Sequence, residues 1–137
     1  MKRGGFKRLQ GRRLVGTYAE GKVLKLSKPI SFLGDVDVET GRIVSPEHEK
    51  FGECVKGKVL VFPEGRGSTV GSYVIYGLKK KGNAPLALVV KKAEAIVAVG
   101  AIIADIPLMD DVEIEEIEDG DWAEVDCGKN EVRVYPS

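Results

Sequence analysis

Glycines, small hydroxyl residues and one basic residue stand together in the stretch 62–73, which reads FPEGRGSTVGSY. Arg66 and Gly67 come first, and Ser68 and Thr69 follow them directly. An apolar run that ends in glycines and is followed by a helix is a common way to build an anion site. The first backbone N–H groups of the helix have no partner there, and the helix dipole favours negative charge. The stretch therefore predicts a small-anion site that contains a hydroxyl group.

The known phosphate-binding motifs do not fit this stretch. The pattern GxxxxGK[ST] is absent from the sequence. The dinucleotide pattern GxGxxG fits at Gly65 and Gly67, but Val70 occupies the position of the third glycine. No acidic residue ends the next apolar run either, since Lys91 follows Val90 and a contact to a ribose is missing. The sequence therefore argues against a nucleotide site.

The hydroxyl of Ser68 has two interpretations. In the first, Ser68 is an N-cap whose side chain accepts a hydrogen bond from an N–H two or three residues further on. In the second, it takes part in chemistry: Gly67 lets the backbone approach a ligand closely, and Arg66 can bind a carboxylate or a phosphate. The residues alone leave both interpretations open.

Other candidate sites are weaker, and we expect no metal ligands in this chain. Residues 35–39, DVDVE, imitate the start of a calcium loop, but the glycine comes one position late, at Gly41, and the pattern predicts a surface turn. His48 lies in a polar loop and is typical of a surface or capping histidine. Cys54 and Cys127 are the only cysteines, whereas an iron–sulfur cluster needs three or four thiolates.

Alternating strands and helices must position the glycine stretch. Short apolar or alternating segments bounded by turn residues predict strands at 13–15, 22–26, 42–44, 58–62, 86–90, 106–109, 122–126 and 131–135. Periodic segments predict helices at about 68–81 and 93–104. The second helix is apolar nearly all round, so we expect it to be buried.

The order of these segments predicts a mixed α/β fold. The strand 58–62, the helix after it and the strand 86–90 make a crossover unit with parallel strands, and both strands are apolar enough to be covered on two faces. Residues 127–130 predict a turn between two antiparallel strands, so that the chain ends in a hairpin.

Length and composition are those of one globular domain that spans residues 1–137. The chain is 43% hydrophobic and 31% charged, and no apolar stretch approaches the length of a membrane span. The first residues are basic and lack the apolar core of a secretory signal, which predicts a cytoplasmic protein.

Charge is balanced overall but unevenly placed. The 21 basic and 21 acidic residues give zero net charge, so there is no overall field that would attract nucleic acid. A basic N-terminal segment covers residues 1–12, and acidic residues are concentrated at 110–121. These two segments are either solvated faces that approach each other in the fold or a docking surface for a partner chain.

Several strings in the sequence resemble one protein family, the aconitase X swivel-domain family, over roughly residues 13–135. The strings are Gly34-Asp35-Val36-Asp37, Thr40-Gly41, His48, Gly52, Gly57-Lys58, Leu60-Val61-Phe62-Pro63, Gly67-Ser68-Thr69-Val70-Gly71-Ser72-Tyr73 and Ala98-Val99-Gly100-Ala101-Ile102-Ile103-Ala104-Asp105-Ile106-Pro107. The pattern GKxLVFPxGxGSTVGSY is long and specific. The resemblance implies a single swivelling β/β/α domain with a central parallel sheet, a second antiparallel sheet and a helical layer.

The resemblance also implies a two-subunit hydro-lyase. A separate large subunit would carry a [4Fe-4S] cluster through its own cysteines, and the two subunits together would act as a heterodimer. The implied archaeal reaction removes water from (R)-5-phosphomevalonate and gives trans-anhydromevalonate 5-phosphate, in a mevalonate route to isoprenoids. The alternatives are the small subunit of a cis-3-hydroxy-L-proline dehydratase, which is the reaction of bacterial relatives, and a non-catalytic swivel or regulatory module.

By the same resemblance, Ser68 falls on the family's catalytic serine, which accepts a proton. A serine hydroxyl is a poor base, so this role requires a strongly positive environment. Arg66, Gly67 and Thr69 would contact the substrate beside it. Asp37 matches a family motif, and it either lines the same cleft or forms an Asx-type turn.

Overall fold

The computed structural model describes residues 5–137, so that part of the predicted basic segment, residues 1–4, lies outside the described residues. The strands are β1 (Lys7–Gln10), β2 (Arg12–Val15), β3 (Tyr18–Lys25), β4 (Val59–Phe62), β5 (Ala87–Val90), β6 (Leu108–Asp110), β7 (Trp122–Asp126) and β8 (Glu131–Tyr135). The helices are α1 (Phe32–Asp35), α2 (Gly71–Lys80) and α3 (Ala95–Ala104), with 3₁₀ turns η1 (Ile114–Glu116) and η2 (Cys127–Lys129).

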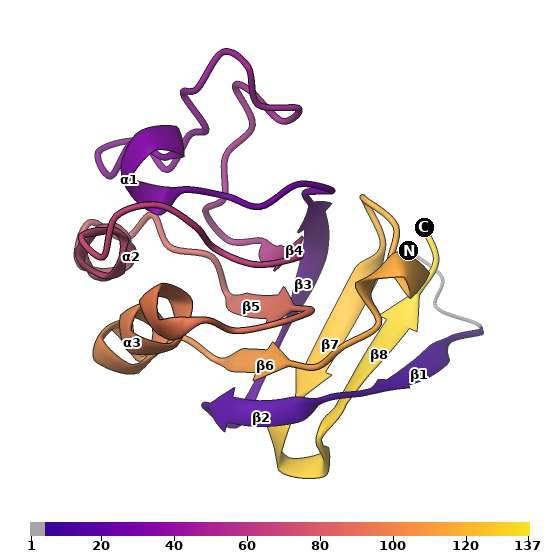
Figure 1. Ribbon diagram of the computed structural model, residues 1–137. Coiled ribbons are helices and arrows are strands. Elements are labelled where there is room, and N and C mark those ends of the chain that lie inside the picture. Colours follow the sequence, from indigo (N-terminus) through magenta and orange to yellow (C-terminus); the bar gives the residue numbers. More distant parts are fainter. Residues whose placement is uncertain (1–4) are drawn as a thin grey trace.

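The chain forms three layers (Figure 1). The three helices cover one face of β4, β5 and β6, and β7, β8 and β1 lie on the other side. The strand order is β1-β8-β7-β3-β4-β5-β6-β2. Strands β3 to β6 run parallel, whereas β7, β8 and β1 continue from β3 in antiparallel pairs, and β2 is antiparallel to β6. The long strand β3 therefore belongs to both sheets.

The two ends of this strand order are consecutive in the sequence. Only Gly11 separates β1 from β2, and its backbone N–H donates to the carbonyl of Asn130 over 3.0 Å. A Cβ on Gly11 would lie 2.7 Å from Sδ of Met109, so glycine allows the chain to cross close to the core here. The N-terminal segment thus joins the antiparallel sheet to the parallel sheet.

Two hydrophobic cores lie on the two faces of the parallel sheet. Successive side chains of a strand point to opposite faces. In β4, Leu60 and Phe62 accordingly pack in the core under the helices, and Val59 and Val61 pack in the core between the two sheets. All four residues are fully buried. This two-sided burial explains why the strand reads as an unbroken apolar run.

The structure confirms the predicted mixed α/β class with its parallel sheet, antiparallel sheet and helical layer. It also confirms that β4 and β5 are parallel on either side of α2, and that β7 and β8 form a hairpin. A predicted strand at 42–44 is wrong, because this segment makes only isolated bridges, from Ile43 to Val36 and from Arg42 to Cys54. Strand β1 and helix α1 were not predicted.

The basic and acidic segments approach each other, which was one of the two alternatives for them. Lys7 forms an ion pair with Glu116 at 3.5 Å, and Arg12 binds Asp110 at 2.9 Å. Among the described residues, no helix has the length and apolar character needed to cross a lipid bilayer.

Candidate functional site

The glycine loop between β4 and α2 lies beside the segment that leads into α1. The N–H of Ile30 donates to the carbonyl of Glu64 over 3.2 Å, and the N–H of Arg66 donates to the carbonyl of Ile30 over 3.0 Å. These two bonds form a short parallel bridge between chain segments that are distant in sequence. The loop therefore has a fixed position at the end of β4.

Two glycines allow the loop to pack closely against Ser31 on one side and Glu94 on the other. Gly67 has φ +92°, a backbone conformation that favours glycine, and a Cβ there would lie 2.7 Å from Oγ of Ser31. A Cβ on Gly65 would lie 2.6 Å from Oε1 of Glu94, the residue before α3. The loop is thus held between the start of α1 and the start of α3, which explains the glycines.

Ser68 is exposed and follows this tight turn. Its Oγ accepts a hydrogen bond from the N–H of Val70 over 3.1 Å, and its carbonyl accepts from the N–H of Gly71 over 2.9 Å. Helix α2 begins at Gly71, so the predicted start near Ser68 is wrong by one turn. Ser68 caps the turn that precedes the helix, and its hydroxyl donates no hydrogen bond within residues 5–137.

Three consecutive backbone N–H groups are unpaired at the same place. Within residues 5–137, the N–H groups of Gly67, Ser68 and Thr69 have no acceptor. Successive unpaired N–H groups at a positive-φ glycine ahead of a helix form an anion-binding concavity. Arg66 is exposed beside them, and its guanidinium makes no hydrogen bond or ion pair within the same range. The loop therefore combines anion-binding donors with one hydroxyl.

Ser31 is a site residue that the sequence reasoning missed. It caps α1, its Oγ accepting a long bond of 3.4 Å from the N–H of Gly34, and its own N–H donates to Oδ2 of Asp35 over 2.9 Å. The next residue, Phe32, is buried against Phe62 with ring centroids 5.9 Å apart. A four-residue helix leaves almost no periodic pattern, so only the capping serine could have indicated it.

Asp37 and His48 each stabilise a local turn. Asp37 accepts the N–H of Glu39 over 3.0 Å at one oxygen and the hydroxyl of Thr40 over 3.1 Å at the other, which is an Asx turn. His48 Nδ1 accepts the N–H of Lys50 over 3.0 Å. No hydrogen bond in the described part of the chain joins Asp37 to the glycine loop.

A buried carboxylate fixes the segment between β5 and α3. Asp110 is 2% exposed and binds Arg12 through two bonds of 2.9 Å, and it also accepts the N–H of Ala93 over 3.3 Å. Burial would raise the pKa of Asp110, but the bonds from Arg12 and from the N–H of Ala93 outweigh it and lower the pKa below its usual value. The pair therefore remains ionised and holds the approach to α3.

The described residues do not fit an iron–sulfur cluster. Residues 5–137 contain no group of three or more His, Cys, Asp or Glu side chains that could hold a metal ion. Both cysteines are free thiols: Cys54 is partly exposed, and burial raises the pKa of the Cys127 thiol. A cubane cluster is held by three or four thiolates, a set that this part of the chain does not supply.

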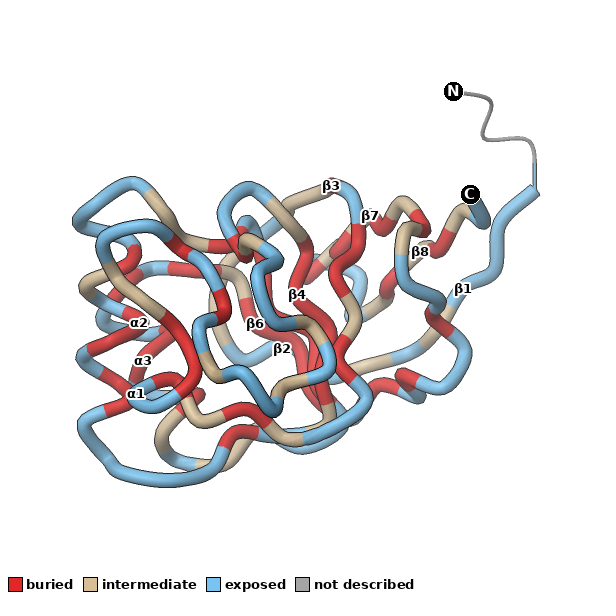
Figure 2. The backbone as a smooth tube through the Cα atoms, turned by 90° about the horizontal axis from the view of Figure 1, so that it is seen from above, coloured by how far each residue is buried: buried red, intermediate tan, exposed pale blue. Residues whose placement is uncertain are grey.

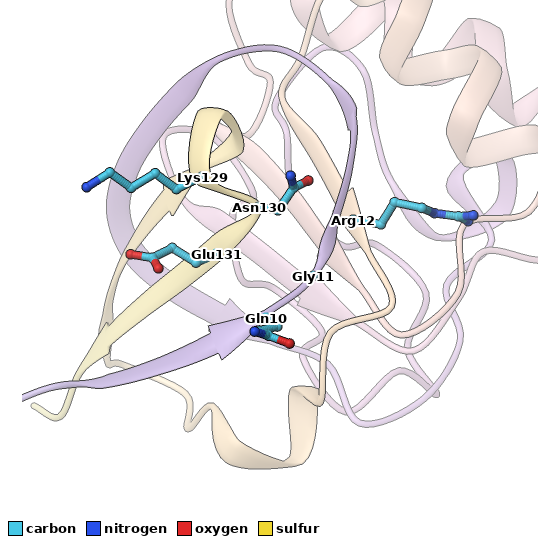
Figure 3. Close-up of a pocket in the computed structure, with 6 residues that line it drawn as sticks. All are labelled: Gln10, Gly11, Arg12, Lys129, Asn130 and Glu131. Carbon is cyan, nitrogen blue, oxygen red and sulfur yellow. The ribbon is translucent and has the colours of Figure 1, made fainter.

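A separate hollow lies where β1 meets β2, next to the turn between β7 and β8 (Figure 3). It is lined by Gln10, Gly11, Arg12, Lys129, Asn130 and Glu131. The side chain of Arg12 points away from Lys129 and Glu131 in this view, toward its bond with Asp110. The side-chain amide of Asn130 accepts the N–H of Arg13 over 2.9 Å. None of the predicted site residues lines this hollow, and we interpret it as a structural junction.

Comparison with protein families and solved structures gives consistent matches. Residues 8–134 match the model of the aconitase X swivel domain. A crystal structure of Thermococcus kodakaraensis aconitase X in its holo form superposes with a TM-score of 0.91 at 51% identity, and the match covers 93% of this chain and 98% of that one.

Curated relatives of nearly the same length carry one name. A protein of Thermococcus kodakarensis is 51% identical over 93% of this chain and 96% of its own length. A protein of Thermococcus sibiricus is 53% identical over 93% of this chain and 98% of its own. A protein of Methanothrix thermoacetophila is 54% identical over 90% of this chain and 91% of its own. Each is named phosphomevalonate dehydratase small subunit.

Proposed function

Because this chain belongs to the aconitase X swivel-domain family, we propose that it is the small subunit of a two-subunit hydro-lyase that dehydrates (R)-5-phosphomevalonate. The product would be trans-anhydromevalonate 5-phosphate, and the enzyme would work in the cytoplasm. The observation that carries this proposal is the identity of 51–53% to full-length relatives named as that subunit. The exposed hydroxyl and free N–H groups of the glycine loop support it from this chain's own residues.

Ser68 is the proposed proton acceptor. Dehydration removes a proton from one carbon and a hydroxide from its neighbour, and a proton next to a carboxylate is only weakly acidic. A serine oxygen accepts it only where positive charge and hydrogen-bond donors stabilise the oxygen as an anion. The N–H of Val70 already donates to Ser68 Oγ over 3.1 Å, and α2 begins three residues after Ser68, at Gly71. Arg66 would add a full charge.

The neighbouring residues of the loop would hold the substrate. Gly67 and Thr69 offer unpaired N–H groups to a carboxylate or phosphate oxygen, and Arg66 offers a planar pair of donors. We keep Asp37 as a further substrate-contacting residue on the basis of the family motif. Its two oxygens already accept bonds within its own turn, so any contact with the substrate would use the remaining lone pairs of this carboxylate.

The cluster of this enzyme is assigned to the larger subunit. An aconitase-like family implies an iron–sulfur cluster, which would bind and polarise the group that leaves. The residues described in this chain do not supply its ligands. We therefore infer that the partner's cysteines hold the [4Fe-4S] cluster and that this chain contributes the base.

Reconstitution tests the proposal. The chain is mixed under anaerobic conditions with the cluster-loaded large subunit from the same organism, and it is assayed in parallel against phosphomevalonate and cis-3-hydroxy-L-proline. We expect each subunit alone to be inactive and the mixture to dehydrate phosphomevalonate. Activity of this chain alone would overturn the two-subunit assignment, and turnover of hydroxyproline alone would change the substrate.

A further inference from the structure

Helix α3 is apolar on all sides but is not buried on all sides. Its ten residues, AIVAVGAIIA, include no polar side chain, and the expectation that the helix is buried is wrong for its outer face. Val97, Gly100, Ala101 and Ala104 face the core, whereas Ile102 is 61% exposed and Val99 and Ile103 are 46% and 41% exposed. A helix of this composition normally has a cover on every face, and a contiguous exposed apolar surface marks an interaction site.

Helix α2 extends this apolar surface. Tyr73 on α2 is 70% exposed, and Val70, directly before the helix, is 47% exposed. Between the two helices lies a groove of about 360 Å³, which is lined by Thr69, Ser72, Tyr73, Ala95, Ile96, Val99 and Ile103. The helices lie together at one end of the molecule, and β1 lies at the other end (Figure 2). We call this surface the α2–α3 groove.

The α2–α3 groove is preformed. The buried hydroxyl of Ser72 on α2 donates to the carbonyl of Ile96 on α3 over 2.9 Å. Gly100 lets the helices approach closely, since a Cβ there would lie 2.5 Å from Cδ1 of Ile75. The spacing of the helices is therefore fixed by buried contacts, and the groove does not need to open before a partner binds.

Chemistry restricts the occupant of the groove to an apolar surface. The seven lining residues carry no charge, and their only hydroxyl groups belong to Thr69, Ser72 and Tyr73. The hydroxyl of Ser72 is already engaged. Apart from the backbone N–H of Thr69, which belongs to the glycine loop, the lining offers a charged peptide or an anionic ligand no ionic partner, so burying such a ligand here would be costly. Aliphatic or aromatic side chains fit the lining.

The position of the groove next to the glycine loop indicates which partner supplies these apolar side chains. Thr69 lines the groove and also belongs to the glycine loop, so whatever covers the groove touches the loop. Under the proposed function, the loop must face the larger subunit. A second copy of this chain placed symmetrically on the groove would instead set one Ser68 loop against the other. We therefore propose that the α2–α3 groove is the surface on which the larger subunit docks, through an apolar segment of that subunit.

Charge placed in the groove tests this assignment, which rests on the proposed function. Val99→Lys and Tyr73→Lys put a cation on each wall. Tyr18→Lys is the matched control, because Tyr18 is 44% exposed, pairs with Asp126 of β7 in the antiparallel sheet and does not line the groove. Each variant of the full chain is first checked for folding by circular dichroism. Its affinity for the large subunit from the same organism is then measured by titration calorimetry.

We expect both groove variants to bind the large subunit at least about tenfold more weakly than the natural chain, with Tyr18→Lys unchanged within about twofold. Ser68→Ala should also bind normally, because it alters chemistry and not docking. Normal binding by both groove variants would overturn the groove assignment and leave the proposed function standing. Loss of self-association in these variants with unchanged affinity for the large subunit would assign the groove to a second copy. Failure of the natural chain to bind would overturn the proposed function itself.

Discussion

The side chain of Ser31 packs directly against Gly67: a Cβ on Gly67 would lie only 2.7 Å from Oγ of Ser31. This contact joins the start of α1 to the loop that carries Ser68, and the buried Phe32 fixes the position of Ser31. Gly67 also has φ +92°, so a side chain there meets both a neighbour and a strained backbone. The relationship explains why the Ser68 loop is defined in space although it is exposed.

Gly67→Ala should therefore displace the loop. The backbone conformation alone costs about 1–3 kcal/mol of folding free energy for a residue with a side chain. The clash with Ser31 adds to this and shifts Ser68. We expect a lower midpoint of thermal unfolding and at least about a tenfold loss of kcat in the reconstituted enzyme, since small displacements of a catalytic group are costly.

Gly52→Ala is the matched control for that prediction. Gly52 has φ +87°, but no atom lies within 4 Å of the position of its Cβ. The Gly52→Ala variant should lose only the stability that the backbone conformation costs, and it should keep its turnover. If Gly67→Ala retained normal kcat, the contact with Ser31 would have no role in placing the loop.

Ser68→Ala should abolish turnover and leave the fold intact. Removal of a general base typically costs about 10²–10⁴ in rate. The single bond from the N–H of Val70 to Ser68 Oγ is worth only about 1 kcal/mol of stability. Steady-state assays of the reconstituted enzyme and thermal unfolding of the chain check the two effects. Ser45→Ala, which removes a hydroxyl bonded to Glu47, is the control, and near-normal kcat in Ser68→Ala would reduce Ser68 to a cap.

Sequence reasoning located the part of this fold that local patterns determine. Strands β4 and β5 are unbroken apolar runs because both of their faces are covered, and the turn chemistry at 127–130 indicated the hairpin. Strand β1, with the sequence KRLQ, is an exposed edge whose pairing with β8 leaves no apolar alternation. Its position depends on the rest of the fold.

The candidate site divides in the same way. The glycine stretch was recognisable because glycines, a hydroxyl and a helix start are local features. Ser31 was not, because its contact with Gly67 exists only after the chain has folded. The burial expected for α3 was wrong on its outer face. An apolar composition indicates that a helix surface will be covered, but not by which chain, and residues 5–137 leave this face exposed.

Arg12→Met should lower the free energy of unfolding more near pH 7 than near pH 3. In the natural chain the folded-state pKa of Asp110 is lowered, so the pair contributes stability that is fully present above the unfolded carboxyl pKa of about 4 and is lost as the pH falls through the folded pKa. Without Arg12, burial would raise the pKa of Asp110 instead. The variant should therefore unfold at lower urea than the natural chain near pH 7, with a smaller gap near pH 3. If the difference in unfolding urea concentration between the variant and the natural chain were equal at both pH values, ionisation of Asp110 would not be its source.

Gly100→Ala should destabilise the helix pair even though alanine favours helices by about 1 kcal/mol over glycine. Its Cβ would lie 2.5 Å from Cδ1 of Ile75, which is 1% exposed and packed in the core under the helices. Overpacking of this kind costs about 1–3 kcal/mol. Thermal unfolding should show a lower midpoint, and Ile75→Val in the same chain should restore part of it by removing Cδ1. A stabilised Gly100→Ala would mean that the helices separate easily.

Arg66→Ala should weaken substrate binding more than it slows the reaction. Arg66 is exposed next to the free N–H groups of the loop, and its guanidinium makes no hydrogen bond or ion pair within residues 5–137, so its charge is available to a carboxylate or phosphate. We expect KM of the reconstituted enzyme to rise about tenfold with a smaller change in kcat. The KM of Arg66→Lys should lie between those of Arg66→Ala and the natural chain, because lysine keeps the charge but replaces a planar pair of donors with a point charge. Arg8→Ala on β1, at the other end of the molecule, should leave KM unchanged. If KM also stayed constant in Arg66→Ala, substrate binding in this loop would rest on the backbone N–H groups alone.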